Sequence, residues 1–316
     1  MSTLPSQLWL FRWLVSLRRS SKDGFTLLEL LISIIIVGII ISGLLYLVVE
    51  MLQLDRREFV LNQVSTDMNR AIDYISSDVE EAIYVYSTPT DVVGELDDID
   101  LSEETPILAF WRPDPLDQDD LDAIDSCTSD ECDLLRLRQA SLTLVVYLQE
   151  ENDEDSIWNG ETRIVRYTLP KYTRIAASLA SNSTPGYADP LSSGNDFATW
   201  EANGTTDGIK QVLVDSVDVP SPDDITEADC PDADLYTRSP STPADGKSFY
   251  VCVREATTGA VNTIGQELTS NQDLVVFLRG NATARQDGLI NALSDASRLP
   301  TLQSRVLLRG VRGEEL

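Results

Sequence analysis

The sequence contains no histidine, and this absence restricts the chemistry that the chain could perform. Histidine is the commonest general base, a frequent zinc ligand and the usual activator of a nucleophile. The sequence also lacks a Gly-x-Ser-x-Gly segment, a phosphate-binding loop and zinc-ligand spacing. No pair of carboxylates stands out, although a carboxylate-pair hydrolase stays open as an alternative. We therefore do not expect an enzyme.

Basic residues are scarce, with 24 Lys and Arg against 52 Asp and Glu and a formal net charge of −28. Phosphate binding requires clustered cations, so we expect no nucleic-acid partner. Strong acidity is typical of a self-repelling soluble surface or of divalent-cation binding. Asp117, Asp119 and Asp122 could offer oxygen ligands to calcium, but their loop lacks the turning Gly and the closing Glu of an EF-hand. We expect a solvated acidic loop there, with no metal site and no cofactor.

Cysteine is also rare. The four cysteines are Cys127, Cys132, Cys230 and Cys252, and all of them follow the long apolar run. If that part of the chain is exported, two disulfides are expected, and four cysteines allow three pairings. Pairs Cys127–Cys132 and Cys230–Cys252 are favoured because each is close in sequence. Four free thiols in a reducing compartment are the alternative.

The long apolar run, residues 30–49, contains no charged side chain. As an α-helix it would measure about 30 Å, which matches the hydrocarbon thickness of a bilayer. A segment with Arg12, Arg18, Arg19 and Lys22 precedes it, and acidic residues dominate after it. The positive-inside rule then places the N-terminus in the cytoplasm and the C-terminal part outside. A secretory signal peptide would instead carry its apolar core before the cleavage site.

The helical pattern continues beyond the apolar run. Apolar residues recur every three or four positions, at Val60, Val64, Met68, Ile72, Ile75, Val79 and Ile83. Charged residues, including Asp73 and Asp78, fill the other faces. This spacing predicts one helix over residues 25–86 whose second half lays an apolar stripe on a folded body. Pro89 and Gly94 are expected to end it.

The rest of the sequence has a β pattern. Candidate strands are residues 107–112, 141–148, 162–169, 209–219, 247–255, 273–279 and 305–310. Long polar loops separate them, the largest at 114–132 and 178–207. The predicted fold is α+β, with the long helix packed on an antiparallel sheet. Trp111, Trp158 and Trp200 lie in or near loops and would stack on sugars, pack in the core or lie exposed as single residues.

The N-terminal stretch resembles a known processing motif. Lys22-Asp23-Gly24-Phe25-Thr26-Leu27-Leu28-Glu29-Leu30-Leu31 is similar to the motif of the type IV pilin family, which includes the pseudopilins of type II secretion systems. The resemblance implies cleavage after Gly24 by a membrane prepilin peptidase, methylation of the new N-terminus at Phe25, and Glu29 as the fifth mature residue. A signal anchor with Glu29 at the membrane interface is the alternative.

The residue types of this motif suit the processing and assembly that the resemblance implies. Gly24 has no side chain to obstruct an extended protease site. A carboxylate at the edge of a membrane helix is costly without a partner, and the freed amine of Phe25 on a neighbouring subunit could pair with Glu29. Such pairing would set the axial register of a filament whose heterologous contacts do not close. Many major pilins carry a Pro where this chain has Tyr46, which puts local helix melting at that position in doubt.

The resemblance divides the chain into a leader (1–24), a transmembrane assembly helix (25–50), the amphipathic half of that helix (51–88) and a β-rich periplasmic head (89–316). It implies a minor pilin or pseudopilin in the inner membrane, with other pilin subunits and the assembly platform as partners.

Residues 69–82 and 273–279 resemble J-type minor pseudopilins, and the acidic, cysteine-poor body is similar to cyanobacterial pseudopilins of hormogonium polysaccharide secretion. The alternative function is a membrane-anchored adhesin or glycan-binding protein displayed through the motif.

Overall fold

The computed structural model describes ten stretches of the chain: residues 26–153, 156–176, 178–192, 195–219, 230–241, 248–254, 260–261, 267–268, 272–282 and 298–308. The predicted leader, the cleavage position Gly24 and the new N-terminus Phe25 lie outside these residues. The chain divides into two compact units, Met1–Arg57 and Glu58–Leu316, and each is described by itself.

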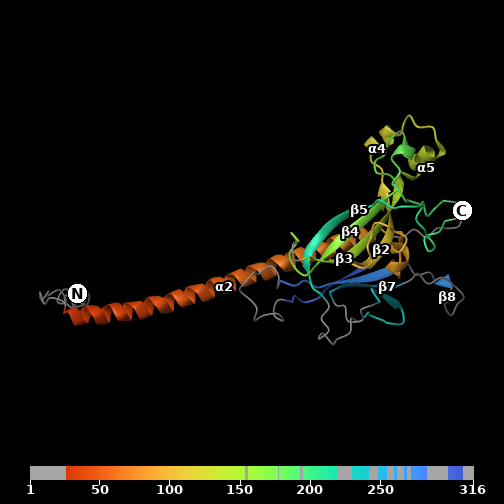
Figure 1. Cartoon of the computed structure of the whole chain (residues 1–316). Helices are drawn as coiled ribbons and strands as arrows, with labels where there is room; N and C mark the ends of the chain where they lie inside the picture. Colours follow the sequence, from red (N-terminus) through yellow and green to blue (C-terminus); the bar gives the residue numbers. More distant parts are fainter. Residues whose placement is uncertain are drawn as a thin grey trace, which may run out of the picture. The chain divides into compact units, whose positions relative to one another are not determined.

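In the first unit, the described residues belong to helix α2 (Leu27–Glu80), which is drawn in red to orange in Figure 1. Residues 26–56 are exposed, although most of them are Leu, Ile or Val. Gly38 and Gly43 have open space where a Cβ would stand. An apolar helix surface that is exposed among the described residues of its unit is typical of a segment that lies in lipid or against another chain. By length and composition, α2 could cross a membrane.

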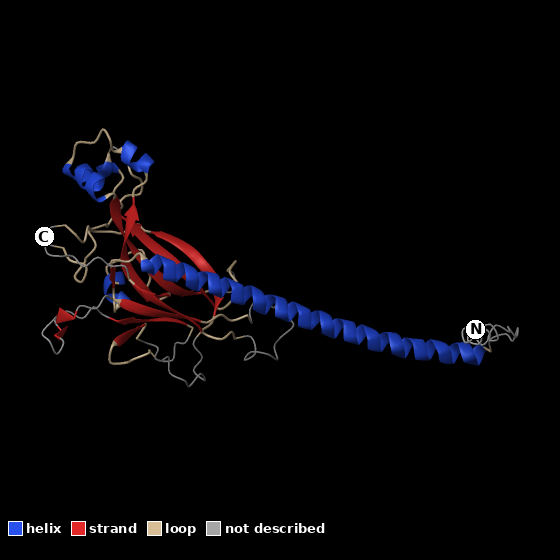
Figure 2. Cartoon of the chain, turned by 180° about the vertical axis from the view of Figure 1, so that it is seen from behind, coloured by secondary structure: helices blue, strands red, loops and turns tan. Residues whose placement is uncertain are grey.

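Most strands in the described part of the second unit belong to two larger antiparallel sheets (Figure 2). The five-stranded sheet runs in the order β1 (Tyr84–Val85), β2 (Glu104–Pro115), β3 (Ala140–Glu151), β4 (Thr162–Pro170) and β5 (Ile209–Val217). The four-stranded sheet runs in the order β11 (Leu302–Leu307), β10 (Asp273–Leu278), β7 (Phe249–Arg254) and β6 (Tyr236–Ser239). An antiparallel bridge between Val217 and Gly280 connects the two sheets.

Shorter elements complete the described part of this unit. They are α3 (Pro89–Val93), α4 (Gln118–Ala123), α5 (Asp130–Arg138), the 3-10 turn η1 (Leu179–Ser181) and the pair β8 (Ala260–Val261) and β9 (Glu267–Leu268).

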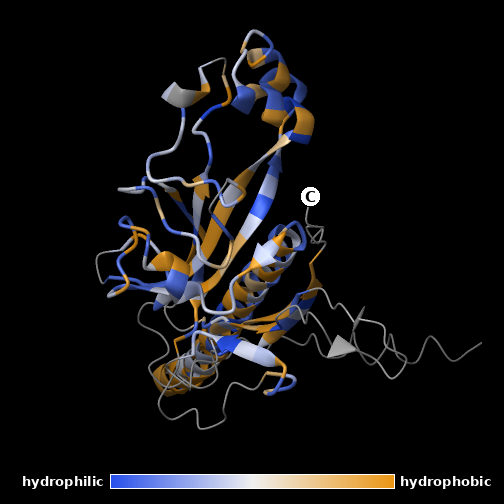
Figure 3. Cartoon of the chain, turned by 90° about the vertical axis from the view of Figure 1, so that its right-hand side faces the viewer, coloured by the Kyte–Doolittle hydropathy of each residue, from blue (hydrophilic) through white to orange (hydrophobic). Residues whose placement is uncertain are grey.

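The main core lies between the second half of α2 and both sheets (Figure 3). The buried stripe of the helix consists of Val64, Met68, Ala71, Ile72, Ile75 and Val79, and Val60 packs at its edge. This stripe meets Phe110, Tyr147 and Ile164 of the five-stranded sheet and Val251, Leu274 and Val276 of the other sheet. The predicted amphipathic half of the helix therefore packs on β-structure, as its spacing indicates.

A second apolar cluster covers the opposite face of the five-stranded sheet. It contains Trp111 and Trp200 in edge contact, with ring centroids 5.5 Å apart. Trp111 Nε1 donates to the hydroxyl of Tyr86, and Trp200 Nε1 donates to a backbone carbonyl. Burial on both faces explains why β2 and β3 read as nearly continuous apolar runs. These two tryptophans are core residues, so they cannot stack on a sugar at the surface.

The α+β prediction is confirmed, with several differences in detail. Helix α2 ends at Glu80 rather than near Tyr86, because Tyr84 and Val85 pair with β2. Pro89 begins α3, and the loop predicted at 114–132 holds α4 and the start of α5. Strand β11 begins at Leu302, three residues before the predicted start. β1 and β6 were not predicted, since two and four residues carry little periodicity.

Candidate functional site

The N-terminal turn of α2 places Thr26 and Glu29 together. The hydroxyl oxygen of Thr26 accepts a hydrogen bond from the backbone N–H of Glu29 at 3.3 Å. Thr26 thus caps the helix, and Glu29 lies in its first turn, where the helix dipole favours a negative charge. The sequence Thr-x-x-Glu within the processing motif is also a capping box pattern. The motif therefore carries a local signal for helix initiation as well as its expected processing site.

Glu29 is exposed, and no basic side chain of the described residues pairs with it. Phe25 lies outside the described residues, so the expected partner amine is not placed. A carboxylate beside an apolar helix is costly in lipid unless it is neutralised. The chemical requirement for a cation near Glu29 therefore stands as a prediction.

In the second unit, Asp78 on α2 forms a buried ion cluster with the five-stranded sheet. Its carboxylate accepts from Arg112 on β2 at 2.7 Å, from Arg166 Nε on β4 at 2.7 Å and from the Tyr147 hydroxyl on β3 at 2.7 Å. Asp78 is only 5% exposed. Donors from three strands thus bind one carboxylate of the helix. These bonds fix the rotation of α2 about its axis and its position along the sheet.

The electrostatics of this cluster follow from its burial. Desolvation, reinforced by the adjacent carboxylate of Asp78, raises the pKa of Tyr147 well above its usual value. Desolvation opposes the charge of Arg112, but Asp114 and Asp78 outweigh it and raise the pKa of that guanidinium. Tyr147 therefore stays a neutral donor, and the arginines stay cationic. These groups act as fixed hydrogen-bond donors to the Asp78 carboxylate.

Sequence reasoning did not find this cluster. It assigned Asp78 to a polar face of the helix, and that assignment is wrong because Asp78 lies beside Ile75 and Val79 in the buried stripe. The sequence carries only a weak signal for the cluster. Asp78 stands next to the apolar stripe of the helix, and Arg112 and Arg166 stand within apolar strands. Only the pairing of three strands brings Arg112, Tyr147 and Arg166 to one carboxylate.

The cysteines form two disulfides, Cys127–Cys132 and Cys230–Cys252, with Cα–Cα distances of 6.1 and 5.7 Å. This is the pairing that the sequence favours. The first disulfide lies in a small lobe built from α4, α5 and η1, which has its own apolar cluster around Ile124. The second joins Cys252 on β7 to the segment before β6.

Two aspartates of the acidic loop in this lobe form hydrogen bonds within the α4 segment. Asp117 is the N-cap of α4, and its carboxylate accepts from the backbone N–H of Asp120 at 2.9 Å. Asp122 accepts from the side chain of Gln118 at 2.8 Å. Within the described ranges, no group of three or more Asp, Glu, Cys or His side chains is arranged to hold a metal ion.

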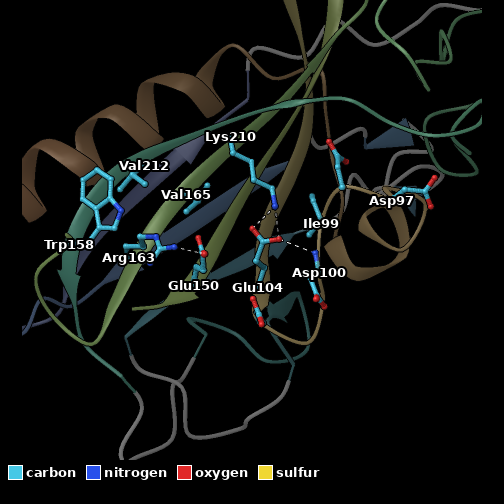
Figure 4. A pocket seen from close by; sticks show the side chains of 12 residues that line it. Asp97, Ile99, Asp100, Glu104, Glu150, Trp158, Arg163, Val165, Lys210 and Val212 are labelled. Atoms are coloured by element: carbon cyan, nitrogen blue, oxygen red, sulfur yellow. Dashed lines mark hydrogen bonds and ion pairs between the residues drawn. The ribbon is translucent and has the colours of Figure 1, made fainter. Parts of the chain in front are cut away.

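An open pocket of about 600 Å³ lies on the five-stranded sheet (Figure 4). Its lining residues are Asp97, Asp98, Ile99, Asp100, Glu103, Glu104, Glu150, Trp158, Arg163, Val165, Lys210 and Val212. Lys210 Nζ contacts both carboxylate oxygens of Glu104, at 2.8 and 2.7 Å, and Arg163 pairs with Glu150. The pocket combines a half-exposed indole, two fixed ion pairs and several further carboxylates.

Two carboxylates of the pocket have shifted pKa values. Desolvation raises the pKa of Glu150, although the adjacent Arg163 opposes the shift. Hydrogen bonds from the side chain and backbone of Ser102 lower the pKa of Asp100. Glu150 is therefore a weaker acid than a free glutamate side chain, and Asp100 is a stronger acid than a free aspartate side chain.

Comparison with known proteins identifies the N-terminal region. The family model of the prokaryotic N-terminal methylation motif matches residues 19–45. Searches among curated proteins and among solved structures found no match. The matched segment contains Gly24, Phe25, Glu29 and much of the apolar run. The motif indicates processing by prepilin peptidase and assembly with other pilins, and with the apolar helix it indicates membrane anchoring.

The motif, over residues 19–45, supports the type IV pilin and pseudopilin family. The second unit agrees with that family only in having a long helix followed by an antiparallel sheet domain. Its ion cluster, disulfide lobe and pocket lie outside the matched segment.

Proposed function

We propose that the chain is a minor pilin or pseudopilin that joins a type IV pilus-like or type II secretion-like filament, at its tip or in its initiation complex. The match to the methylation motif at residues 19–45 carries this proposal. The exposed apolar half of α2 supports it, because such a surface requires lipid or other helices around it. A subunit with this role is structural, and we propose no enzymatic activity.

In this proposal, residues 1–24 are a leader, 25–50 are a transmembrane assembly helix, 51–80 are its amphipathic continuation to the end of α2, and the residues after Glu80 form a periplasmic head. The subunit waits in the inner membrane with its N-terminus in the cytoplasm. Prepilin peptidase cleaves after Gly24 and methylates Phe25. The assembly platform then transfers the subunit into the filament, where Glu29 pairs with the amine of a neighbouring Phe25.

Within the family, we propose a large minor subunit of the J type. The basis of this choice is the resemblance of residues 69–82 and 273–279 to J-type minor pseudopilins. A role in cyanobacterial polysaccharide secretion is the narrower form of the hypothesis, and co-purification with the other subunits of such a system tests it. Recovery with a glycan and without pilin-like subunits would favour the displayed adhesin instead.

Mass spectrometry of the mature N-terminus tests the processing step. The expected N-terminus is N-methylated Phe25, and any other N-terminus contradicts the proposal. For assembly, Glu29→Ala should be cleaved normally yet be absent from sheared filaments, while Glu50→Ala, at an exposed position of the same helix, should still be incorporated. Equal incorporation of both variants would rule out the role given to Glu29.

A further inference from the structure

The pocket in Figure 4 has an apolar floor and one aromatic wall. Val165 on β4 and Val212 on β5 are direct partners in the sheet and form the floor with Ile99. Trp158 comes from the loop between β3 and β4 and is 39% exposed, unlike the buried Trp111 and Trp200. The indole and the floor together offer a surface for an apolar or planar group of a ligand.

The charges of the pocket are strongly unbalanced. Six carboxylates line it against two cations, and each cation is engaged by a carboxylate of its own, in the pairs Lys210–Glu104 and Arg163–Glu150. Asp98 accepts three hydrogen bonds, from Tyr167, Thr206 and the Gly208 backbone.

Three carboxylates remain, those of Asp97, Asp100 and Glu103, here named the acidic rim. They are exposed, and no basic side chain of the described residues forms a salt bridge with any of them. Figure 4 shows Asp97 and Asp100 at the end of the pocket away from Trp158.

This arrangement selects among ligand classes. A negative pocket on a chain of net charge −28 repels phosphate, sulfate and anionic polysaccharides. A neutral sugar could stack on Trp158 but would form no ion pair with the acidic rim. A lysine or arginine side chain compensates that charge and forms charge-assisted hydrogen bonds with the carboxylates.

The pocket also offers a hydrogen-bond donor. The Lys210 side chain is 37% exposed, and its ammonium has three N–H groups, for which Glu104 is the hydrogen-bond partner among the described residues. A backbone carbonyl of a bound peptide fits this donor, whereas a simple polyamine has no acceptor for it. The pocket therefore matches a ligand with a cation, a carbonyl and an apolar group spaced along one chain.

We propose that this pocket is a docking site for a basic peptide segment of a partner protein. A Lys or Arg side chain of the segment occupies the acidic rim, and a neighbouring apolar side chain lies on Trp158 and the valine floor. Peptide binding at this pocket requires neither cleavage at Gly24 nor filament assembly. The test of the pocket is therefore independent of the tests of the proposed function.

The test uses the full chain in detergent micelles, labelled with 5-fluorotryptophan, and the Trp158 fluorine signal assigned with Trp158→Phe. The probes are a heptapeptide with two Lys and one Leu, the same peptide with Glu in place of Lys, and maltohexaose. Only the Lys peptide should shift the Trp158 signal. The rim variant Asp97→Asn/Asp100→Asn/Glu103→Gln should bind it at least about tenfold more weakly, as is typical for loss of close charge pairs.

The matched control is Asp119→Asn/Asp122→Asn/Asp125→Asn, which removes the same number of exposed carboxylates from the α4 region. This control should keep the affinity within about twofold if long-range attraction is a minor contribution at 0.15 M salt. Equal weakening in both triple variants would show non-specific attraction and overturn the proposal. Absence of a Trp158 shift with the Lys peptide would also overturn it, as would a shift with maltohexaose alone, which would assign the pocket to a neutral glycan.

Discussion

The carboxylate of Asp78 on α2 and the guanidinium of Arg166 on β4 form a two-point ion pair, with N–O distances of 2.7 and 3.1 Å. Both residues are at most 9% exposed. Because the pair joins the long helix to the middle of the five-stranded sheet, it couples the only long helix among the described residues to the fold of the second unit.

Asp78→Asn is expected to lower the free energy of unfolding by about 3–5 kcal/mol, since it leaves the buried charge of Arg166 without its partner. Urea denaturation of the full chain in detergent, followed by near-UV circular dichroism, measures the change. Asp73→Asn, an exposed position on the same helix, is the control and should change stability by less than about 0.5 kcal/mol. Similar effects of the two substitutions would contradict the structural role of the cluster.

Gly280→Ala should destabilise the contact between α2 and the sheets. A Cβ at this position would stand 2.7 Å from Met68 Cγ and 3.0 Å from Val64 Cγ1. The expected loss is about 1–3 kcal/mol in the free energy of unfolding, as for other overpacked cores. The measurement is the same urea titration.

Two further variants make this prediction specific. Gly43→Ala should leave the unfolding of the second unit unchanged, because nothing lies within 4 Å of its Cβ position. In a Met68→Ala background, Gly280→Ala should cost less than it does alone, because the crowded side chain has been removed. Additive effects would show that the two residues do not compete for space.

Buried tyrosines should make the second unit sensitive to alkaline pH. The pKa is raised, mainly by desolvation, for Tyr86, Tyr147, Tyr167, Tyr172, Tyr187 and Tyr236. Above about pH 10 the unfolded chain loses these protons while the folded chain retains them. The stability they support is therefore complete well below pH 10 and is lost as pH rises, by at most about 1.4 kcal/mol per pH unit for a tyrosine that ionises only in the unfolded chain.

The variant Tyr147→Phe isolates one of these groups. Its free energy of unfolding should fall less steeply between pH 10 and 11.5 than that of the unchanged chain, by about 1.4 kcal/mol per pH unit. Urea titrations at several pH values give both slopes. The same slope in both proteins would mean that Tyr147 ionises alike in the folded and unfolded states.

The two disulfides should contribute unequally to stability. They close segments with sequence separations of 5 and 22 residues. The chain-entropy relation gives about 2 kcal/mol for Cys127–Cys132 and about 3 kcal/mol for Cys230–Cys252. Paired Ala substitutions and thermal unfolding test the order.

Loss of each disulfide should also affect a different part of the second unit. Loss of Cys127–Cys132 should increase hydrogen exchange in α5, because the lobe has its own small cluster around Ile124 and Leu135. Loss of Cys230–Cys252 should increase exchange in β6 and β7. A larger loss of stability from the first pair would reverse the expected order.

Much of the fold could be predicted because its signals are local. The spacing from Val64 to Val79 is enough to define a helical stripe, and runs of apolar and β-branched residues are enough to locate β3 and β4. The disulfide pairs are short in sequence, so proximity along the chain favours the pairs found in the fold. The helical pattern predicts an end of α2 that is too late in the sequence. Tyr84 and Val85 are not helical, because they pair with β2, a strand that begins almost twenty residues later.

The sequence by itself determined the N-terminal region, because the methylation motif, the cap at Thr26 and the apolar run are each written in consecutive residues. Tertiary structure decided the rest. Asp73 and Asp78 look alike in the sequence, yet only Asp78 is buried, because strands β2, β3 and β4 bring their donors to it. The pocket beside Trp158 likewise exists only because hydrogen bonding between strands gathers residues that are far apart along the chain.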